Sequence, residues 1–507
     1  MPYSYTYGSG TENDPYQVWT ADDLDGIRDY CLPEYNGTYF KQMADIDLGV
    51  SPWIDEGTID TYGNSGTGWV PIEYRPEGTH TTYGLNGVYD GNNFEIENLT
   101  MDRGDKSFGI GLFGSCYVDL DMDYDAPVFK NMIFKNPNVA GNNRLGVLIG
   151  MLDTNLWAED FDLDNDSHRP HIINCHIKGG TITGQGGAYI GGMGGRFNNS
   201  GLIIKDSTVE CTIIAVGNAT SADVGGIVGQ LGAADVINSH FYGNINFTNI
   251  RTNTGTHCNR VGGLIGEFRG MVSPSIADHE IIDSSFTGDI VISSDHGANS
   301  REIGGIIGII DRAGITIKRC VSIANIVFSG DAHIDSEFGR VGGLLGSCDY
   351  QWDGSYINIE QCFALGSISG SNIYQEVGGF IGEVYYGHIE NCYSLMNVEG
   401  NQYVGGFIGR VYYDYLVLRQ CYSAGQVNGQ QDSGGFIGDL FNVDWIDVAF
   451  EILNCYFDSD QSGDSIGDGY STPKTTAEMT YPYSDPDNVY IDWDFHTVWA
   501  HDKGGSA

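Results

Sequence analysis

The sequence is short of positive charge. Its 507 residues include 24 lysines and arginines against 67 aspartates and glutamates, which gives a formal net charge of -43 at pH 7. Such an acidic surface repels the phosphates of nucleic acids and of anionic membranes, so neither is an expected partner. The same charge favours solubility in a salty setting, where screening relieves the self-repulsion.

Long apolar runs and an ordinary export signal are also lacking. No stretch of 18 apolar residues occurs, so no segment is expected to insert into a membrane. The first residues, MPYSYTYGSG, have neither the basic start nor the apolar core of a signal peptide. Two routes to an extracellular or cell-surface position stay open: a leader removed earlier, or synthesis in the cytoplasm followed by release within a virion.

What the sequence contains instead is repetition. A hexad of the pattern [VI]-G-G-[LIF]-[ILV]-G recurs along the chain, and an apolar residue and a polar-small-aromatic triplet such as Asn391-Cys392-Tyr393 follow it. The hexads are Val224–Gly229, Val261–Gly266, Ile303–Gly308, Val341–Gly346, Val377–Gly382 and Val404–Gly409, with a variant at Ser433–Gly438 and looser copies starting at Gly109, Gly146 and Ile190. Three strand-sized runs per unit and no helix predict an all-β fold, a single-stranded parallel β-helix of about ten coils.

The 11 cysteines fit this repeat better than they fit disulfides or a metal site. Aligning the units gives one common position, which holds Leu99, Met132, Cys175, Ser207, Ser239, Ser285, Cys320, Cys362, Cys392, Cys421 and Cys455. A disulfide framework would not alternate with serine, and the CxxC or Cys/His spacing of a zinc site is absent. The pattern therefore predicts an inward-facing ladder of free, buried thiols.

The hexad followed by N-C-[YF] resembles the GLUG-motif repeat, roughly from Phe108 to Asp458. This resemblance implies a large surface or secreted protein of bacteria or their viruses, while the motif itself names no activity. Residues 1–103 are expected to form an N-terminal cap and first coil, residues 104–458 the repeats, and residues 459–507 a C-terminal cap and tail. In the first cap, Thr20 as N-cap and Asp23 predict a short helix through Tyr30.

Two aspartate-rich insertions follow the hexad strand in adjacent units. Their alternating carboxylates are Asp119, Asp121, Asp123 and Asp125 in DLDMDYD, and Asp160, Asp162, Asp164 and Asp166 in EDFDLDND. Stacked coils would bring the two insertions together, and oxygen-rich clusters suit Ca²⁺. Neither insertion has the glycine of an EF-hand loop. Calcium is thus a predicted ligand of these residues, and no cofactor is required.

In four later units, the segment after the hexad strand contains aromatic residues where the earlier units have these aspartates. Equivalent residues of successive coils stack about 4.8 Å apart, which predicts an aromatic strip interleaved with aspartates. The first aromatic of each pair is expected to point inward and the second outward. The predicted binding residues are Tyr350, Trp352, Tyr386, Tyr413, Tyr415 and Trp445. Exposed rings beside carboxylates are typical of sugar-binding grooves.

These features predict a non-enzymatic adhesin or receptor-binding rod, of a bacterial surface protein or a phage tail fibre, that recognises a cell-surface polysaccharide or glycoconjugate. Repetition or homotrimer formation would multiply weak single sites. One alternative is a tailspike-type glycosidase or lyase, with Asp353, Glu383 and Asp414 as candidate catalytic carboxylates. Another is a fibre, surface-layer or virion-decoration subunit that works by lateral self-assembly. No nucleophile elbow, HExxH motif, P-loop or dinucleotide fingerprint occurs in the sequence, so binding is favoured over catalysis.

Overall fold

The chain was analysed as a computed structural model. The model describes residues 2–60, 63–76, 82–104, 109–118, 126–154, 169–185, 188–198, 201–218, 222–250, 259–270, 279–294, 302–330, 339–349, 356–370, 375–441, 450–463, 470–480 and 489–499. These residues fold as two compact units. The first comprises Met1–Thr248 and Leu264–Ile276, and the second Asn249–Gly263 and Ala277–Ala507.

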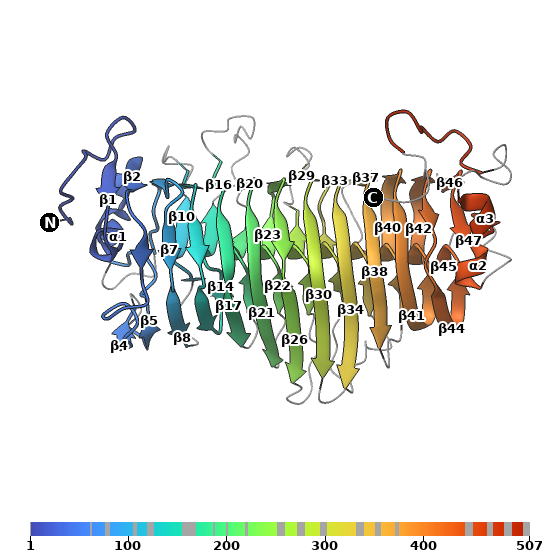
Figure 1. The fold of residues 1–507 in the computed structure, drawn as a ribbon, viewed down its shortest axis with the longest axis horizontal. Helices are drawn as coiled ribbons and strands as arrows, with labels where there is room; N and C mark the ends of the chain where they lie inside the picture. The colour runs from blue at the N-terminus through green and yellow to red at the C-terminus, as the bar shows by residue number, and fades with distance from the viewer. Residues whose placement is uncertain are drawn as a thin grey trace. The chain divides into compact units, whose positions relative to one another are not determined.

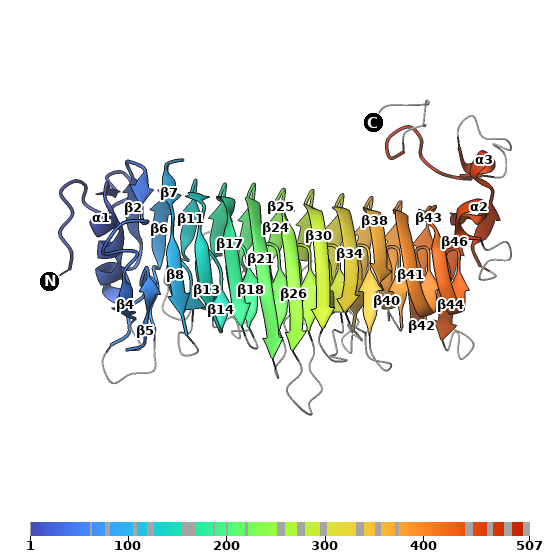
Figure 2. The ribbon, with the colours of Figure 1, turned by 60° about the horizontal axis from the view of Figure 1, so that its bottom comes forward.

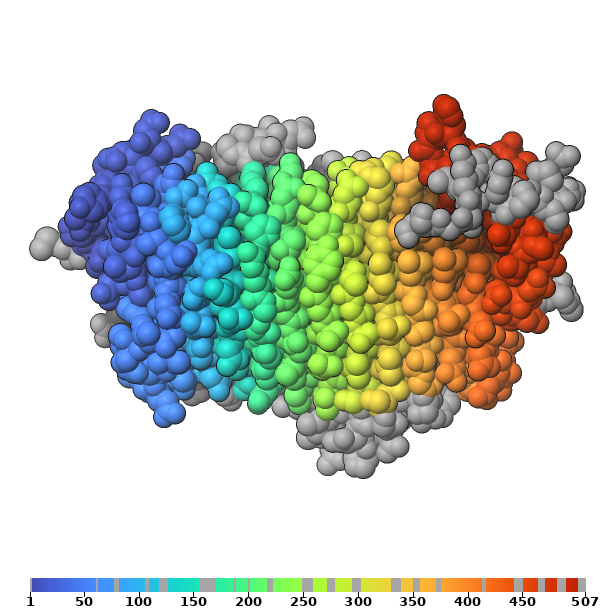
Figure 3. Space-filling view, in the orientation of Figure 1, coloured from blue at the N-terminus to red at the C-terminus, as the bar shows by residue number. Residues whose placement is uncertain are grey.

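Parallel β-strands make up most of each unit, and strands of successive coils run side by side (Figures 1 and 2). In the second unit, for example, Ile381 pairs with Ile408 and Ile408 pairs with Ile437, all in parallel. In the space-filling view, the side chains of each unit line up in rows from coil to coil (Figure 3). The predicted parallel β-helix is confirmed.

The first unit contains three short helices, α1 (Ala21–Gly26), η1 (Ile27–Tyr30) and η2 (Pro33–Tyr35). Its strands are β1 (Tyr16–Val18), β2 (Thr38–Gln42), β3 (Ile46–Asp47), β4 (Glu56–Ile59), β5 (Ser65–Gly68), β6 (Gly87–Asp90), β7 (Glu95–Glu97), β8 (Thr100–Arg103), β9 (Gly109–Ile110), β10 (Phe113–Val118), β11 (Val128–Lys130), β12 (Ile133–Lys135), β13 (Asn138–Gly141), β14 (Arg144–Leu145), β15 (Ile149–Thr154), β16 (His171–Ile173), β17 (His176–Gln185), β18 (Tyr189–Gly191), β19 (Gly194–Asn198), β20 (Ile203–Lys205), β21 (Thr208–Asn218), β22 (Asp223–Gly225), β23 (Val228–Gly232), β24 (Asp235–Ile237), β25 (His240–Tyr242) and β28 (Ile265–Arg269). Strand β26 (Asn244–Ile250) contains the chain position at which the first unit passes into the second.

The second unit ends in two short helices, α2 (Ser459–Ser462) and α3 (Thr476–Met479). Its strands are β27 (Arg260–Gly262), β29 (His279–Ile282), β30 (Ser285–Ser294), β31 (Glu302–Gly304), β32 (Ile307–Asp311), β33 (Ile315–Lys318), β34 (Val321–Gly330), β35 (Arg340–Gly342), β36 (Leu345–Cys348), β37 (Ile357–Glu360), β38 (Phe363–Gly370), β39 (Val377–Gly378), β40 (Ile381–Glu390), β41 (Tyr393–Gly405), β42 (Ile408–Arg419), β43 (Tyr422–Ser423), β44 (Val427–Gly434), β45 (Ile437–Phe441), β46 (Glu451–Leu453), β47 (Tyr456–Asp458) and β48 (Thr472–Lys474). None of the helices in the described ranges has the length and apolar character needed to cross a membrane.

The hexad forms one corner of each coil. In Val377–Gly382, β39 belongs to one parallel sheet and β40 to the other, and Gly379 and Phe380 make the bend between them. The backbone folds so tightly here that a Cβ on Gly378 would lie 1.8 Å from the carbonyl oxygen of Ile381. No side chain fits in that space, which is the physical reason for the repeated glycine.

The polar residue of the triplet forms a second corner. It adopts a left-handed backbone conformation in coil after coil, with φ between 46° and 56°, at Asn98, Asn131, Asn174, Asp206, Asn238, Asp283, Arg319, Gln361, Asn391, Gln420 and Asn454. Asparagine and aspartate tolerate this conformation better than other non-glycine residues. The corner therefore explains why the triplet so often begins with one of them.

The next residue of the triplet fills the interior. Cys320, Cys362, Cys392 and Cys421 are each 0 % exposed, and Cys455 is 2 % exposed. The cysteines of the described residues form no disulfides, so the predicted ladder of buried thiols is confirmed. One member of the alignment was wrong. Ser285 pairs with Val321 and is half-buried. The interior position equivalent to Cys320 is held by the neighbouring Ser284, because the left-handed corner of this coil lies at Asp283.

Thiol accessibility tests this burial. Desolvation raises the pKa of Cys175 and of Cys211 to about 12 and raises that of Cys392 well above its usual value. Because the thiolate is the reactive form, the native protein is expected to leave its ten described cysteines unmodified by a thiol reagent such as DTNB. All 11 should react in denaturant. Rapid reaction of more than one thiol per native chain would contradict the interior ladder.

Short helices and long-range contacts occur at both ends of the described chain. At the start of α1, Thr20 and Asp23 form a reciprocal capping box, and η1 continues to Tyr30, which confirms the predicted helix. In the second unit, β48 pairs with β47, and the residues after α3 return along earlier coils. There the Trp499 indole nitrogen donates to Asn391 Oδ1 at 3.0 Å, and the Trp493 indole nitrogen donates to the Asn454 carbonyl at 3.0 Å.

Candidate functional site on the hexad face of the second unit

Charged residues stand directly before and after the hexads of the second unit, and we call their outer surface the hexad face. Before the hexads, Arg260 pairs in register with Glu302, and Glu302 with Arg340. After them, Glu383 pairs with Arg410, and Arg410 with Asp439. The sign of the charge alternates from one coil to the next in both columns. Neighbouring coils are about 4.8 Å apart, so this order brings opposite charges together.

Ion pairs link the two columns. Arg340 Nη1 lies 3.2 Å from Glu302 Oε1, and the same guanidinium contacts Glu383. Arg410 Nη1 lies 3.4 Å from Glu376 Oε1, and Arg410 Nε lies 3.0 Å from Asp439 Oδ2. Glu376 is 4 % exposed and Glu383 is 1 % exposed. Charges buried this deeply require their partners, because the cost of removing them from water is large.

An aromatic row runs beside these ion pairs. The ring centroids of Tyr385 and Tyr412 are 5.0 Å apart, and those of Tyr412 and Phe441 are 4.7 Å apart. The guanidinium carbon of Arg410 lies 4.8 Å from the Tyr412 centroid, 4.6 Å from that of Phe441 and 4.3 Å from that of Tyr403. Arg410 is therefore held both by carboxylates and by the faces of three rings.

Burial shifts the titration of two groups on the hexad face. It raises the pKa of Glu376, although the nearby Arg340 and Arg410 act in the opposite direction. One oxygen of that carboxylate, Oε2, is buried and accepts no hydrogen bond from the described residues. Burial likewise raises the pKa of Tyr385 to about 12. Tyr385 is thus a neutral phenol at physiological pH, able to donate and accept hydrogen bonds.

One residue of the predicted aromatic strip, Tyr386, has a described side chain. Tyr386 of β40 is half-buried and pairs in register with Tyr415 of β42. Tyr413, Asp414 and Tyr415 belong to β42, and their side chains lie outside the part of the chain that the structure describes. The remaining predicted members, Tyr350, Trp352, Asp353 and Trp445, lie outside the described residues.

The expected inward orientation of the first aromatic of each pair needs correction. Val384 and Val411 are fully buried and take the interior positions, whereas Tyr385 and Tyr412 are half-buried in the aromatic row. The register between β40 and β42 shifts between Val384 and Tyr386, and this irregularity interrupts simple alternation. The candidate catalytic residue Glu383 is ion-paired with Arg340, and its catalytic role stays a prediction.

The calcium prediction cannot be placed on this face. Its eight residues, Asp119, Asp121, Asp123, Asp125, Asp160, Asp162, Asp164 and Asp166, lie outside the described residues. Among those that the structure does describe, no three His, Cys, Asp or Glu side chains gather in a way that could hold a metal ion. Calcium binding by the two insertions stays a prediction.

Sequence reasoning missed the alternating charges, although a signal for them exists. The residue before the hexad reads Arg260, Glu302, Arg340 and Glu376 in successive units, and the residue after it reads Glu383, Arg410 and Asp439 in the last three. Aligning the hexads and comparing charge at the flanking positions would have shown the pattern. The aromatic row consists of the first aromatics of successive units, and it was missed because these residues were expected to point inward. The register shift itself is visible in the sequence as two extra residues of β42 between Val411 and Tyr415.

The fold and its corners define a parallel β-helix of repeated units. The model of the GLUG motif matches residues 374–399, which include β39, β40 and the first half of β41, so the resemblance seen in the sequence is confirmed.

Two curated proteins are similar to parts of the chain. Halomucin of Haloquadratum walsbyi is 31% identical over 143 residues, which are 28% of this chain and 1% of halomucin. A protein of Evansella cellulosilytica described as a Gly-rich membrane protein is 36% identical over 107 residues, 21% of this chain and 10% of that protein. The chain thus matches only a small share of either relative's length.

Among solved structures, the chain is similar to one from Bacteroides ovatus described as a candidate immunoglobulin A1 protease. The superposition has a TM-score of 0.39 and 19% sequence identity, and it covers 68% of this chain and 87% of that one.

Proposed function

We propose that this chain is a non-enzymatic binding segment of a surface-exposed protein and that it holds cell-surface glycans on the hexad face of the second unit. The surface location is supported by the GLUG motif and by the similarity to halomucin and to a Gly-rich membrane protein. A bacterial adhesin and a phage tail fibre are both compatible with this role.

One observation carries the proposal: an aromatic row from three successive coils packs against buried ion pairs. Tyr385, Tyr412 and Phe441 stack on one another, so much of each ring face is occupied by its neighbour. The hydroxyl-bearing edges of Tyr385 and Tyr412, together with the partly exposed carboxylate of Asp439, are what such a row offers to a ligand. A ligand with many hydroxyl groups and short apolar patches suits that surface. Repetition at about 4.8 Å along the coils favours an extended polysaccharide over a compact molecule.

Glycan retention tests the proposal. The purified chain is incubated with bacterial capsular and lipopolysaccharide glycans, and both retention and newly released reducing or unsaturated ends are recorded. Retention without new ends is expected. The Tyr386→Ala and Tyr412→Ala variants should each bind roughly tenfold more weakly, because a tenfold change corresponds to about 1.4 kcal/mol and an aromatic contact contributes an amount of that order.

A matched control is Tyr242→Ala, since Tyr242 is 44% exposed on β25 of the first unit. This variant should bind as the unchanged chain does. Equal retention of all three variants would contradict the hexad face as the site. New ends that disappear in Glu383→Gln would instead support the polysaccharide-degrading alternative. Loss of retention in EDTA would support a role for Ca²⁺.

A further inference from the structure

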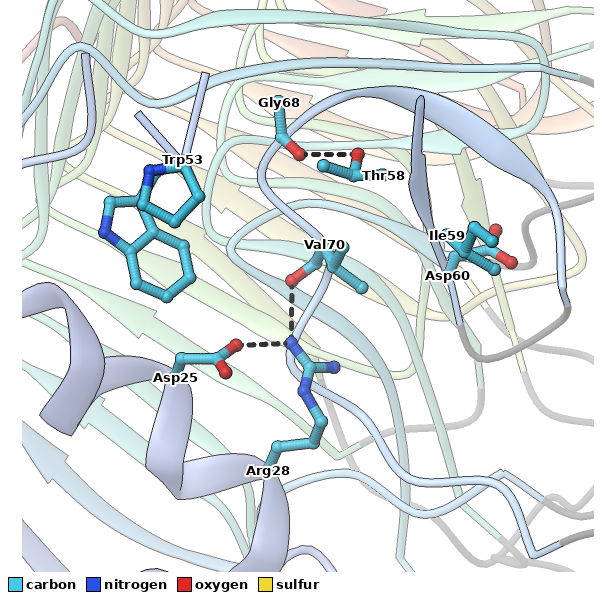
Figure 4. Close-up of a pocket in the computed structure, with 9 residues that line it drawn as sticks. Asp25, Arg28, Trp53, Thr58, Ile59, Asp60, Gly68 and Val70 are labelled. Atoms are coloured by element: carbon cyan, nitrogen blue, oxygen red, sulfur yellow. Dashed lines mark hydrogen bonds and ion pairs between the residues drawn. The ribbon is translucent and has the colours of Figure 1, made fainter. Parts of the chain in front are cut away.

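The N-terminal cap of the first unit contains a pocket of about 320 Å³, far along the chain from the hexad face of the second unit. Trp53 lies on one side of the space, Ile59 and Asp60 lie on the other, and Asp25 and Arg28 lie along its base (Figure 4). The size is within the range of pockets that hold small organic ligands.

The base of the pocket is rigid because Arg28 is fixed by several acceptors. Its Nη1 atom donates to the Pro71 carbonyl at 2.6 Å, and its Nη2 atom donates to the Val70 carbonyl at 3.0 Å and to Asp25 Oδ1 at 2.8 Å. These bonds tie α1 and η1 to the chain after β5. They also hold Asp25 in one orientation at the edge of the space.

The walls are fixed in the same way. Buried Arg103 donates from Nη1 to the Thr58 carbonyl at 2.9 Å and from Nη2 to Thr58 Oγ1 at 2.8 Å, which anchors β4. On the opposite wall, Trp53 packs on the buried Trp69 with ring centroids 5.1 Å apart. Trp53 itself is half-buried and lines the pocket. The Trp53 ring that lines the pocket is therefore held in place by Trp69.

Each charged side chain that lines the pocket has a partner of opposite charge. Asp25 is paired with Arg28, and Asp60 attracts the guanidinium of the buried Arg103, which does not itself line the pocket. Because these charges are already compensated, a simple ion gains little by entering. What remains are the apolar surfaces of Trp53, Ile59 and Val70 and hydrogen-bonding groups at the rim. A further hydrogen-bonding group is Asp25 at the base, whose carboxylate accepts from Arg28 alone among the described residues.

We infer that this pocket binds a neutral hexopyranose, either one residue of a glycan or a free monosaccharide. A pyranose ring combines an apolar C–H face, which packs on an indole, with hydroxyl groups that donate to carboxylates. The ring would place its apolar face on Trp53 and donate a hydroxyl hydrogen bond to Asp25. This inference does not depend on the proposed function, since the pocket belongs to the first unit and the hexad face to the second.

Saturation-transfer NMR on the full chain with methyl glycosides of glucose, galactose, mannose and N-acetylglucosamine tests the inference. At about 10 mM ligand, a Kd near 1 mM gives nearly full occupancy. At least one glycoside is expected to receive saturation. Asp25→Asn removes the carboxylate and Ile59→Trp fills the space, and each should weaken the bound glycoside at least tenfold. Ile59 is 66% exposed, so its replacement leaves the core untouched.

Ile323→Trp is the matched control, because Ile323 is 43% exposed on β34 of the second unit, away from the pocket in the chain. It should leave glycoside binding unchanged. Absence of saturation for every glycoside overturns the inference, as does equal binding by Asp25→Asn and Ile59→Trp. Binding of lysine methyl ester in place of the glycosides would also overturn it and make the pocket a cation site. Tyr386→Ala and Tyr412→Ala should not affect this assay, so failure of the pocket and failure of the hexad face are distinguishable.

Discussion

Replacing Phe407 by alanine is expected to lower the free energy of unfolding by about 3–5 kcal/mol. Phe407 is 0 % exposed, and its ring stacks between Phe380 and Phe436 at centroid distances of 4.6 Å and 4.8 Å. The hexad bend holds the backbone in a tight path, so the surrounding coils cannot close over the space that the ring leaves. The cost therefore includes the lost transfer free energy and the cavity. Urea denaturation followed by circular dichroism measures it.

Leu395→Ala provides the control within the same unit. Leu395 is 39% exposed on β41, so removing it should change the free energy of unfolding by no more than about 0.5 kcal/mol. Phe407→Leu, which keeps most of the apolar volume, should be less destabilising than Phe407→Ala. If Phe407→Ala unfolded at the same urea concentration as Leu395→Ala, the aromatic stack would not be part of the core.

Replacing Arg410 by methionine is expected to cost a similar amount, roughly 3–5 kcal/mol, because it leaves buried carboxylate charge without its partner. Arg410 pairs with Glu376 at 3.4 Å and with Asp439 at 3.0 Å, and Glu376 is only 4 % exposed. Methionine keeps the apolar contact with Tyr412 and Phe441. The decrease in the free energy of unfolding, measured by urea denaturation, therefore mainly reflects the loss of the positive charge.

The pH dependence of this variant has a defined sign. Burial already raises the pKa of Glu376 in the folded chain, and Arg410 opposes that rise, so loss of Arg410 raises the pKa further. A carboxyl whose folded pKa is raised carries no penalty below its unfolded pKa. The penalty grows as the pH rises from the unfolded to the folded pKa and stays at its full size above it. The difference between Arg410→Met and the unchanged chain should therefore be larger at pH 8 than at pH 4.

Two comparisons isolate the contribution of the Arg410–Glu376 ion pair to the free energy of unfolding. Adding Glu376→Gln to Arg410→Met should restore part of the stability at pH 8, because the unpaired charge is gone. Arg319→Met is the exposed counterpart: Arg319 and Asp283 pair with side chains 45% and 46% exposed, so its loss should cost less than about 1 kcal/mol. Equal costs for Arg319→Met and Arg410→Met would show that burial does not strengthen the pair on the hexad face.

Much of the fold could be predicted from the sequence because each coil repeats the same local constraints. The hexad glycines mark a bend with no room for a side chain, and the polar residue of the triplet marks a left-handed corner. Cys392 and its equivalents then follow the corner into the interior. The error in the thiol alignment, Ser285 in place of Ser284, arose where two serines stand together and only the corner at Asp283 distinguishes them.

The candidate sites were less predictable, because they depend on contacts between coils. The sequence contains Arg340, Glu383, Arg410 and Glu376, yet their pairing follows from the diagonal approach of residues before and after different hexads. The pocket of the first unit was even less predictable from the sequence. It joins residues of α1, η1 and β4 that share no motif, through the hydrogen bonds of Arg28 and Arg103 to distant carbonyls.

The sequence by itself determined the coil, its two corners, the buried thiol position and the capped helix at Thr20, since all of these arise from backbone geometry and side-chain size within one repeat. Only the tertiary structure decided which charges meet on the hexad face, that Val384 rather than Tyr385 points inward, and that Trp493 and Trp499 return to earlier coils. Those outcomes depend on side-chain packing between residues of different coils, which a repeat pattern does not encode.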